Sequence, residues 1–285
     1  MPHNWFKHFY LLSVLSSLFW AYQIWARASA YRLIAHYVSD YRYPTMKIDQ
    51  LVVLWLVMLI QGSRRLYEAF AYAKSSRSTM WIGHWLMGLG FYLFINIAIW
   101  IEGVGSSASY FCLVFHTDMR VIATLRLYDD THDPNYLHSS NAFRLMAIVE
   151  LLGIARYSYS QNRLHHYLAT LPAAPHYEVP KKYAFTTVIC PHYGEEVLIY
   201  HGLYFLGGYP APNLTLLMAY IFVYLNLNIT ARGTREWYKE KFGDEAVKAK
   251  SLMLTKAFGE SLLEPFGLSL MYKPTQYVLR QIIGG

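Results

Sequence analysis

Three long stretches of this chain contain no charged side chain, and this feature limits what the chain can fold into. They are residues 9–26, 78–101 and 197–231. A helix needs about 20 mainly apolar residues to cross the hydrocarbon core of a bilayer. The first two stretches are each long enough for one crossing, and the third is long enough for two crossings joined by a Gly- and Pro-rich turn at 207–213. The chain is therefore predicted to be an integral membrane protein.

The composition and the placement of charge agree with this prediction. Only 15 % of the 285 residues are charged, against about 25 % in soluble domains. The net charge is +7, and basic residues gather at 232–256, after the last uncharged stretch. Because loops rich in Lys and Arg face the cytosol, the C-terminal side is predicted to be cytosolic. This placement favours an anionic membrane face or a phosphate-bearing cofactor, and no nucleic acid partner is expected.

The predicted fold is all-α, an integral membrane bundle of about seven transmembrane helices. The helices are expected over residues 9–27, 48–72, 79–101, 107–127, 141–168, 184–206 and 212–236. Polar connections are expected at 28–47, 128–140 and 172–182. Residues 1–258 are interpreted as a single membrane-embedded domain, and residues 259–285 as a C-terminal tail of uncertain structure.

Polar side chains recur at helical spacing inside these segments, so that each set shares one face of its helix. In the second segment, Gln61, Arg64 or Arg65, Glu68 and Tyr72 form such a stripe. An unpaired charge inside a bilayer is costly, so these side chains are expected to face a cavity or one another. The alternative is a helix end whose arginines reach the lipid head groups.

Three further stripes follow along the chain. They consist of Gln161 and His165; of His192, Glu196 and Tyr200; and of Asn228, Arg232, Arg235 and Lys239. The second of these is the strongest local signal, because two acids follow Pro191 and then no charge occurs until residue 232. The last stripe suits phosphate oxygens, but a cytosolic helix end alone explains its charges about as well.

No metal site is predicted. The His–Glu pair at 192 and 196 has no third ligand at a spacing typical of metal sites. The acid- and histidine-rich segment 128–135 is interpreted as a solvated loop.

Together, these motifs resemble the steroid 5α-reductase family, and within it the polyprenol reductase branch. The resemblance extends from about Leu51 to Phe258. It is carried by Gln61-Gly62-Ser63-Arg64-Arg65-Leu66-Tyr67-Glu68, His84, Gln161-x-x-x-His165, Tyr177-Glu178-Val179-Pro180, Pro191-His192-Tyr193 with Glu196 and Tyr200, and Trp237-Tyr238-Lys239-x-Lys241-Phe242.

The resemblance implies a seven-helix membrane fold that holds NADPH in a cavity open to the cytosol, and reduction of a carbon–carbon double bond conjugated to a carbonyl. Gln61, Arg65 and Glu68 would then lie near the nicotinamide and the substrate, as the predicted catalytic residues. The implied cofactor-binding residues are Gln161, His165, Tyr177, His192, Glu196, Arg235 and Tyr238.

The chain departs from the family pattern at three places. Steroid-reducing members have a tyrosine where this chain has Gln61, which argues against a steroid substrate. The family's Leu-Arg after the Gln-x-x-x-His helix is here Leu171-Pro172, and its Pro-Lys-x-Arg-Lys run is replaced by residues 246–250. The last two differences concern the contacts expected with the cofactor phosphates.

The expected activity is NADPH-dependent reduction of the α-isoprene double bond of a polyprenyl lipid, converting polyprenol or polyprenal to dolichol or dolichal. This reaction would serve dolichol synthesis for protein N-glycosylation at the endoplasmic reticulum membrane. The aldehyde is the better substrate chemically, because an allylic alcohol has no carbonyl oxygen to accept charge.

Three alternatives stay open at this point. They are a 3-oxo-steroid 5α-reductase, a membrane methyltransferase of the isoprenylcysteine type, which residues 191–195 and 240–245 also resemble, and a lipid-binding scaffold without activity. No obligate protein partner is evident from the sequence.

Overall fold

The computed structural model describes residues 5–39, 46, 48–73, 81–104, 134–172, 176–208 and 212–253. Within these residues the fold is all-α, as predicted. The helices are α1 (Phe6–Trp25), α2 (Ser29–Ser39), α3 (Ile48–Ala71), α4 (Ile82–Ile101), α7 (Pro134–Thr170), α8 (Pro191–Gly207) and α9 (Leu214–Phe242). Two short 3-10 turns, η2 (Tyr183–Thr186) and η3 (Asp244–Ala246), complete the described elements.

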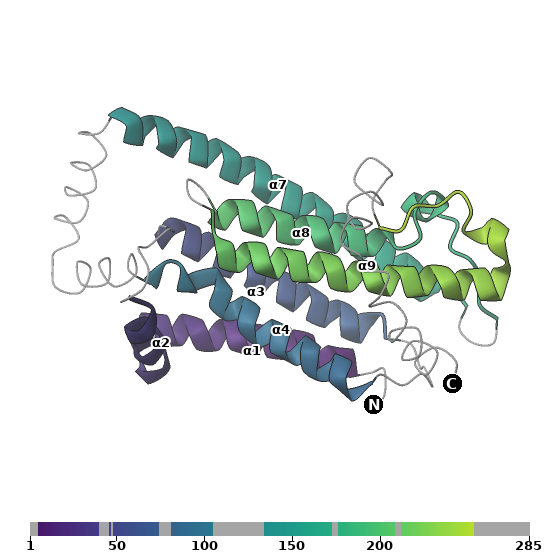
Figure 1. Cartoon of the computed structure of the whole chain (residues 1–285), viewed down its shortest axis with the longest axis horizontal. Coiled ribbons are helices and arrows are strands. Elements are labelled where there is room, and N and C mark those ends of the chain that lie inside the picture. Colours follow the sequence, from purple (N-terminus) through teal and green to yellow (C-terminus); the bar gives the residue numbers. More distant parts are fainter. Residues whose placement is uncertain are drawn as a thin grey trace.

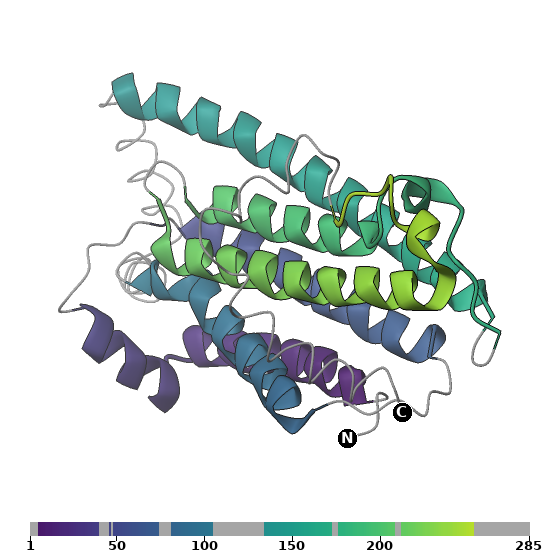
Figure 2. The same cartoon turned by 45° about the vertical axis from the view of Figure 1, so that its right-hand side comes forward.

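The six long helices lie side by side in one bundle and alternate in direction (Figure 1). Helix α1 packs against α3 and α4, while α8 packs between α7 and α9. Contacts of α3 with α8 and of α4 with α9 join the two groups, and the turned view shows the same arrangement (Figure 2). The first turn of α1 and the last turn of α9 therefore lie at the same end of the bundle, which also holds the start of α8.

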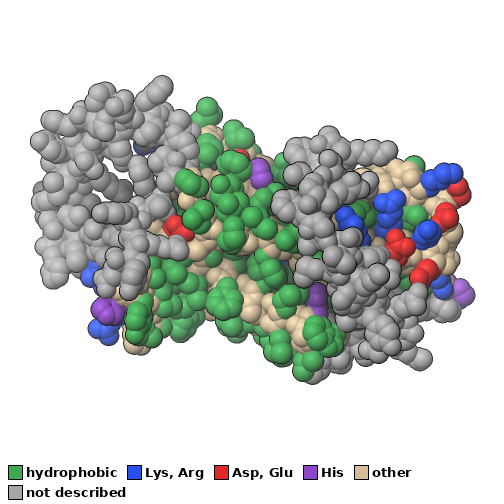
Figure 3. All heavy atoms as spheres, in the orientation of Figure 1, with side chains coloured by type: hydrophobic (Ala, Val, Ile, Leu, Met, Phe, Trp, Pro, Cys, Tyr) green, Lys and Arg blue, Asp and Glu red, His purple; other side chains and the backbone are tan. Residues whose placement is uncertain are grey.

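Candidate membrane spans coincide with the uncharged stretches. Among the described helices, α4 and α9 are long and apolar enough to cross a membrane, and the bent pair α1–α2 counts as a third candidate if it forms one span. Hydrophobic side chains cover the middle of the surface in Figure 3, and charged ones gather at one end. These helices indicate an integral membrane protein.

The count of seven spans remains a prediction. The expected span over 107–127 and the expected tail at 259–285 lie outside the described residues. Helices α3, α7 and α8 are present but do not meet the same length and hydropathy criteria. Helix α8 has only 17 residues, and α3 and α7 carry charged residues within their length.

One prediction for the N-terminal half is wrong for an identifiable reason. The segment 28–47, expected to be a polar connection, contains α2, which turns from α1 by 78°. The buried side chain of Gln23 accepts hydrogen bonds from the amides of Ala30 at 3.1 Å and Tyr31 at 3.4 Å. These two amides belong to the first turn of α2, where backbone N–H groups have no partner within the helix. Gln23 of α1 therefore caps α2 across the bend between the two helices.

The other boundary corrections concern α7 and α8. Helix α7 begins at Pro134, inside the predicted loop 128–140, and proline is well suited to a first helical position. Helix α8 begins at Pro191 rather than at residue 184. The residues just before it are extended, because the amides of Ile189 and Cys190 donate to the carbonyls of Ser251 and Leu252, both at 2.8 Å. The chain after α9 is thereby fastened to the start of α8.

Replacing Gln23 by methionine tests the cap on α2. Met has a similar length but no acceptor, so two amides would lose their partner at a cost of about 1–2 kcal/mol. We expect a lower midpoint of thermal unfolding in detergent, measured by circular dichroism. The matched control is Tyr22→Phe at an exposed neighbouring position, which should leave the midpoint unchanged. Equal midpoints for both variants would contradict the capping role.

Candidate active site

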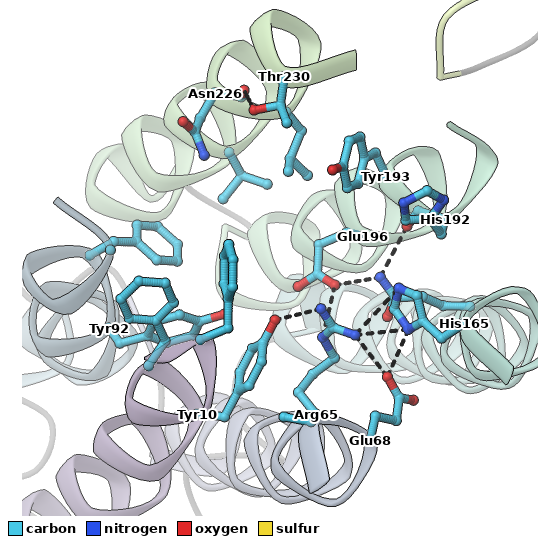
Figure 4. Close-up of a pocket in the computed structure, with 18 of the residues that line it drawn as sticks. Tyr10, Arg65, Glu68, Tyr92, His165, His192, Tyr193, Glu196, Asn226 and Thr230 are labelled. Atoms are coloured by element: carbon cyan, nitrogen blue, oxygen red, sulfur yellow. Dashed lines mark hydrogen bonds and ion pairs between the residues drawn. The ribbon is translucent and has the colours of Figure 1, made fainter. Parts of the chain in front are cut away.

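A cavity of about 530 Å³ lies inside the bundle and is lined by side chains from all six long helices. Helices α1, α4 and α9 contribute mainly apolar and aromatic residues, including Phe9, Met87 and Phe222. Helices α3, α7 and α8 contribute most of the charged and hydrogen-bonding residues. Figure 4 shows Arg65, Glu68, His165 and Glu196 directed toward one another on one side of the cavity. One cavity thus combines a polar wall with an apolar one.

The predicted stripe on α3 faces the interior. Arg64 donates to Gln61 Oε1 at 2.8 Å and forms an ion pair with Glu68 one turn later. Arg65 Nη1 donates to Glu68 Oε2 at 2.7 Å. The Glu68 side chain is only 3 % exposed. Glu68 therefore offsets part of the charge of the two arginines, as the cost of buried charge requires.

The α7 stripe meets the α3 stripe. His165 Nδ1 lies 2.8 Å from Glu68 Oε2 and 2.8 Å from Arg65 Nη1. This nitrogen can donate to the carboxylate or accept from the guanidinium, but it cannot do both. Gln161 accepts from Arg64 and donates to the carbonyl of His192 at 3.0 Å. The α7 side chains therefore connect α3 with α8.

The α8 stripe completes the network through Glu196. Its carboxylate accepts from Gln161 and from Gln61 Nε2 at 3.5 Å, and it lies 3.8 Å from Arg65 Nε. Two glutamates thus balance two arginines in the polar wall. The three stripes at 61–72, 161–165 and 192–200, which are far apart in the sequence, form one connected group.

Tyr10 of α1 belongs to this group, although sequence reasoning did not identify it. Its hydroxyl oxygen accepts a hydrogen bond from Arg65 Nη2, and its ring centroid lies 4.8 Å from Arg65 Cζ. Tyr92 of α4 packs edge-on to it, with ring centroids 5.7 Å apart. The available signal was a tyrosine in an uncharged stretch, and α1 contains a second tyrosine at position 22.

Three of the predicted cofactor-binding residues lie elsewhere. Tyr177, Arg235 and Tyr238 are not among the side chains that line the cavity. Tyr177 packs edge-on against Trp237 at 5.3 Å, and Tyr238 is buried against Trp237 and Phe242. The structure therefore gathers Gln61, Arg65, Glu68, Gln161, His165, His192 and Glu196 around the cavity and leaves the other predicted residues beside the C-terminal end of α9.

Two lysines share that end of the bundle. Burial lowers the pKa of Lys250, and the positive charge of Lys181 lowers it further. Lys250 directly precedes the residues that pair with the start of α8. Neighbouring ammonium groups favour a bound anion, so this pair could hold a phosphate group outside the membrane-spanning helices.

The cavity wall also offers a polar atom for a ligand. His192 Nδ1 is buried and, among the described residues, has no hydrogen-bond partner. Buried polar groups are normally paired, so an unpaired one on a cavity wall suits a bound polar ligand such as a nucleotide cofactor. Within the described ranges, no group of three or more His, Cys, Asp or Glu residues could hold a metal ion, and the loop 128–135 lies outside them.

Comparison with known proteins places this geometry in context. Polyprenal reductase 1 of Oryza sativa subsp. indica is 27 % identical over 86 % of this chain and 76 % of its own length. Polyprenal reductase of Saccharomyces cerevisiae is 27 % identical over 87 % of this chain and 71 % of its own. Polyprenal reductase of Xenopus tropicalis is 26 % identical over 89 % of this chain and 79 % of its own. No solved structure matches the chain significantly.

The family description named 3-oxo-5-alpha-steroid 4-dehydrogenase matches residues 112–255, half of the chain. This segment includes the stripes of α7, α8 and α9, whose resemblance to the steroid 5α-reductases is evident in the motifs themselves. The chain therefore belongs to the steroid 5α-reductase family.

Proposed function

We propose that this protein reduces the α-isoprene double bond of a polyprenyl aldehyde with NADPH. The observation that carries the proposal is the cavity in which a polar wall centred on Arg65 faces an apolar wall from α1, α4 and α9. The family generally uses NADPH, and the relatives are named polyprenal reductases. The product, dolichal, would serve dolichol synthesis for protein N-glycosylation at the endoplasmic reticulum membrane, with the C-terminal side of this chain in the cytosol.

The polar wall suits the charge that develops during such a reduction. A hydride added to the β-carbon of a conjugated aldehyde moves an electron pair onto the carbonyl oxygen, and a fixed positive charge stabilises the resulting enolate. Bound NADPH would supply the hydride. An allylic alcohol offers no oxygen that can accept this electron pair, so the aldehyde is the proposed substrate.

The side chains around Arg65 have distinct roles in this proposal. Glu68 and Glu196 hold the guanidinium from two sides, which orients it toward the cavity. Gln61 braces Glu196 and Arg64 from outside the cavity wall, so its contribution would be to position the network. His165, Gln161 and His192 present polar atoms for the cofactor.

The adenosine end of NADPH would lie near the cytosol-directed end of α9. Arg235, Tyr238 and Tyr177 are the residues proposed there by family resemblance. Lys181 and Lys250 would supply positive charge for a phosphate. Pro172 cannot supply this charge, although it stands where the family has an arginine.

A 3-oxo-steroid is the second candidate substrate. The family description names such a compound, and its conjugated carbonyl would require the same chemistry. The presence of Gln61 instead of tyrosine favours the polyprenyl aldehyde. Family membership also favours reduction over methyl transfer.

Purified protein with NADPH should distinguish these substrates. We expect consumption of polyprenal, with polyprenol and a 3-oxo-Δ4-steroid reduced at least ~100-fold more slowly, a difference of about 2.7 kcal/mol in the barrier. The measurement is product analysis by mass spectrometry over a time course. Fast reduction of polyprenol without turnover of polyprenal would refute the proposal, and preferred reduction of the steroid would support the second candidate.

The Glu196→Gln variant tests the polar wall. Glutamine keeps the shape and removes the charge that faces Arg65, so we expect kcat/KM to fall by about 100-fold. The adjacent Glu195→Gln is the matched control, because Glu195 bonds Ser160 at 2.6 Å and does not line the cavity. Its activity should stay near that of the original protein. Thermal unfolding in detergent should show that both variants are folded. If Glu196→Gln were as active as Glu195→Gln, Glu196 would not belong to the site.

The Lys250→Met variant tests the phosphate contact. Loss of one charge-assisted contact, about 1.5 kcal/mol, corresponds to a roughly tenfold weaker affinity for NADPH. NADH lacks the 2′-phosphate, so a contact with that group predicts unchanged NADH affinity. Lys248→Met is the control, since Lys248 is exposed and pairs with Glu245 at 3.0 Å. Titration by cofactor fluorescence measures the affinities of both variants for NADPH and NADH. Unaltered NADPH affinity in Lys250→Met would place the phosphate elsewhere.

A further inference from the structure

Tyr10 occupies an unusual position in the cavity. It comes from α1, whereas the charged residues of the polar wall come from α3, α7 and α8. Its side chain extends from the aromatic side toward Arg65, as Figure 4 shows. Its ring packs edge-on against the ring of Tyr92, with the ring centroids 5.7 Å apart, and this contact fixes the plane of the Tyr10 ring. The hydroxyl therefore lies where the aromatic and charged walls of the cavity meet.

The bond between Tyr10 and Arg65 can form in only one direction. A guanidinium has five N–H donors and no acceptor, so the tyrosine oxygen accepts and its own O–H remains available. Acceptance from a cation also draws electron density from the oxygen and makes the O–H a stronger donor. The Tyr10 hydroxyl therefore lies in the cavity wall, where Arg65 orients and polarises it.

The predicted catalytic residues on α3 are less suited to donate a proton or a hydrogen bond. Glu68 accepts from Arg64, Arg65 and Asn162 and contacts His165, so its carboxylate oxygens are already used as acceptors. Gln61 donates to Glu196 and accepts from Arg64, and it does not line the cavity. Neither side chain has a donor directed at a ligand.

Four other tyrosines line the cavity and form the relevant comparison, namely Tyr72, Tyr92, Tyr193 and Tyr200. The hydroxyl of Tyr72 donates to Asn162 Oδ1 at 3.4 Å. Within the described part of the chain, no hydrogen bond joins any of these four hydroxyls to an arginine, a lysine or a histidine. Among the described residues, Tyr10 alone combines a position in the wall with a bond to a cation.

We propose that Tyr10 is a further catalytic residue, whose O–H donates to the carbonyl oxygen of the substrate during conjugate reduction. This inference rests on the proposed function. The hydride forms a C–H bond at the β-carbon, the electron pair of the C=C bond forms a new double bond between the α-carbon and the carbonyl carbon, and the C=O π pair moves to oxygen. Tyr10 stabilises this oxygen by its hydrogen bond, backed by Arg65. A proton from solvent then bonds to the α-carbon and the C=O bond re-forms.

The Tyr10→Phe variant removes one oxygen atom and tests this role. We expect kcat for polyprenal to fall by about 100-fold, the effect typical of losing one donor to a developing oxyanion, while the NADPH dissociation constant stays unchanged. The control is Tyr31→Phe, a buried tyrosine that packs against Trp100 outside the cavity. Unchanged kcat in Tyr10→Phe would overturn the proposal.

A second measurement does not depend on turnover. Geranial, a two-isoprene conjugated aldehyde, is bound without reduced cofactor and its carbonyl stretching band is recorded by infrared difference spectroscopy. A hydrogen bond from Tyr10 lowers the frequency relative to geranial bound to Tyr10→Phe. If the band is lowered but the original protein reduces no polyprenal, the proposed function fails and the Tyr10 contact stands. If the band is the same in both proteins, the Tyr10 contact fails, whatever the activity.

Should Tyr10→Phe fail to fold, 3,5-difluorotyrosine at position 10 replaces it. This residue keeps the hydroxyl and the ring but has a more acidic O–H. The proposal predicts a further lowering of the carbonyl frequency, and an unchanged frequency would overturn it.

Discussion

The burial of two adjacent arginines is the constraint on which the rest of the structure depends. Arg64 and Arg65 lie in the interior of a bundle whose visible face in Figure 3 is apolar over its middle. Unpaired, either charge would be prohibitively costly at that position. Their partners come from α1, α3, α7 and α8, so satisfying them requires these four helices to pack in one register. The same contacts that stabilise the bundle also build the polar wall of the cavity.

This constraint explains why the helices that form the site look least like membrane helices. Helix α3 carries Arg64, Arg65 and Glu68, and α7 carries polar residues along the face that meets them. Helices α4 and α9 bear fewer such groups and satisfy the length and hydropathy criteria for a span. A protein that places charge inside a membrane bundle must separate helices that face lipid from helices that face the site.

The cavity divides the proposed chemistry between its two walls. The apolar wall would accommodate the isoprenoid part of the substrate, and the polar wall would position the cofactor and stabilise charge at the carbonyl oxygen. The proposed hydrogen bond from Tyr10 lies at the boundary of the two walls, where the reacting carbon atoms would have to be. His192 Nδ1, which has no partner among the described residues, and the neighbouring Lys181 and Lys250 extend the polar side toward the C-terminal end of α9.

By itself, the sequence determined the all-α class, the three apolar stretches and the faces of α3, α7 and α8 that carry polar residues, because helical spacing and hydropathy are local properties. It could not determine that Gln61, Gln161 and Glu196 meet, since contacts between residues so distant along the chain depend on how the helices pack. Tyr10 and the capping role of Gln23 were beyond its reach for the same reason, because each acquires its role only from a partner on another helix or another turn of the chain. Tertiary structure alone decided that Tyr177 and Tyr238 lie outside the cavity that holds His165 and His192.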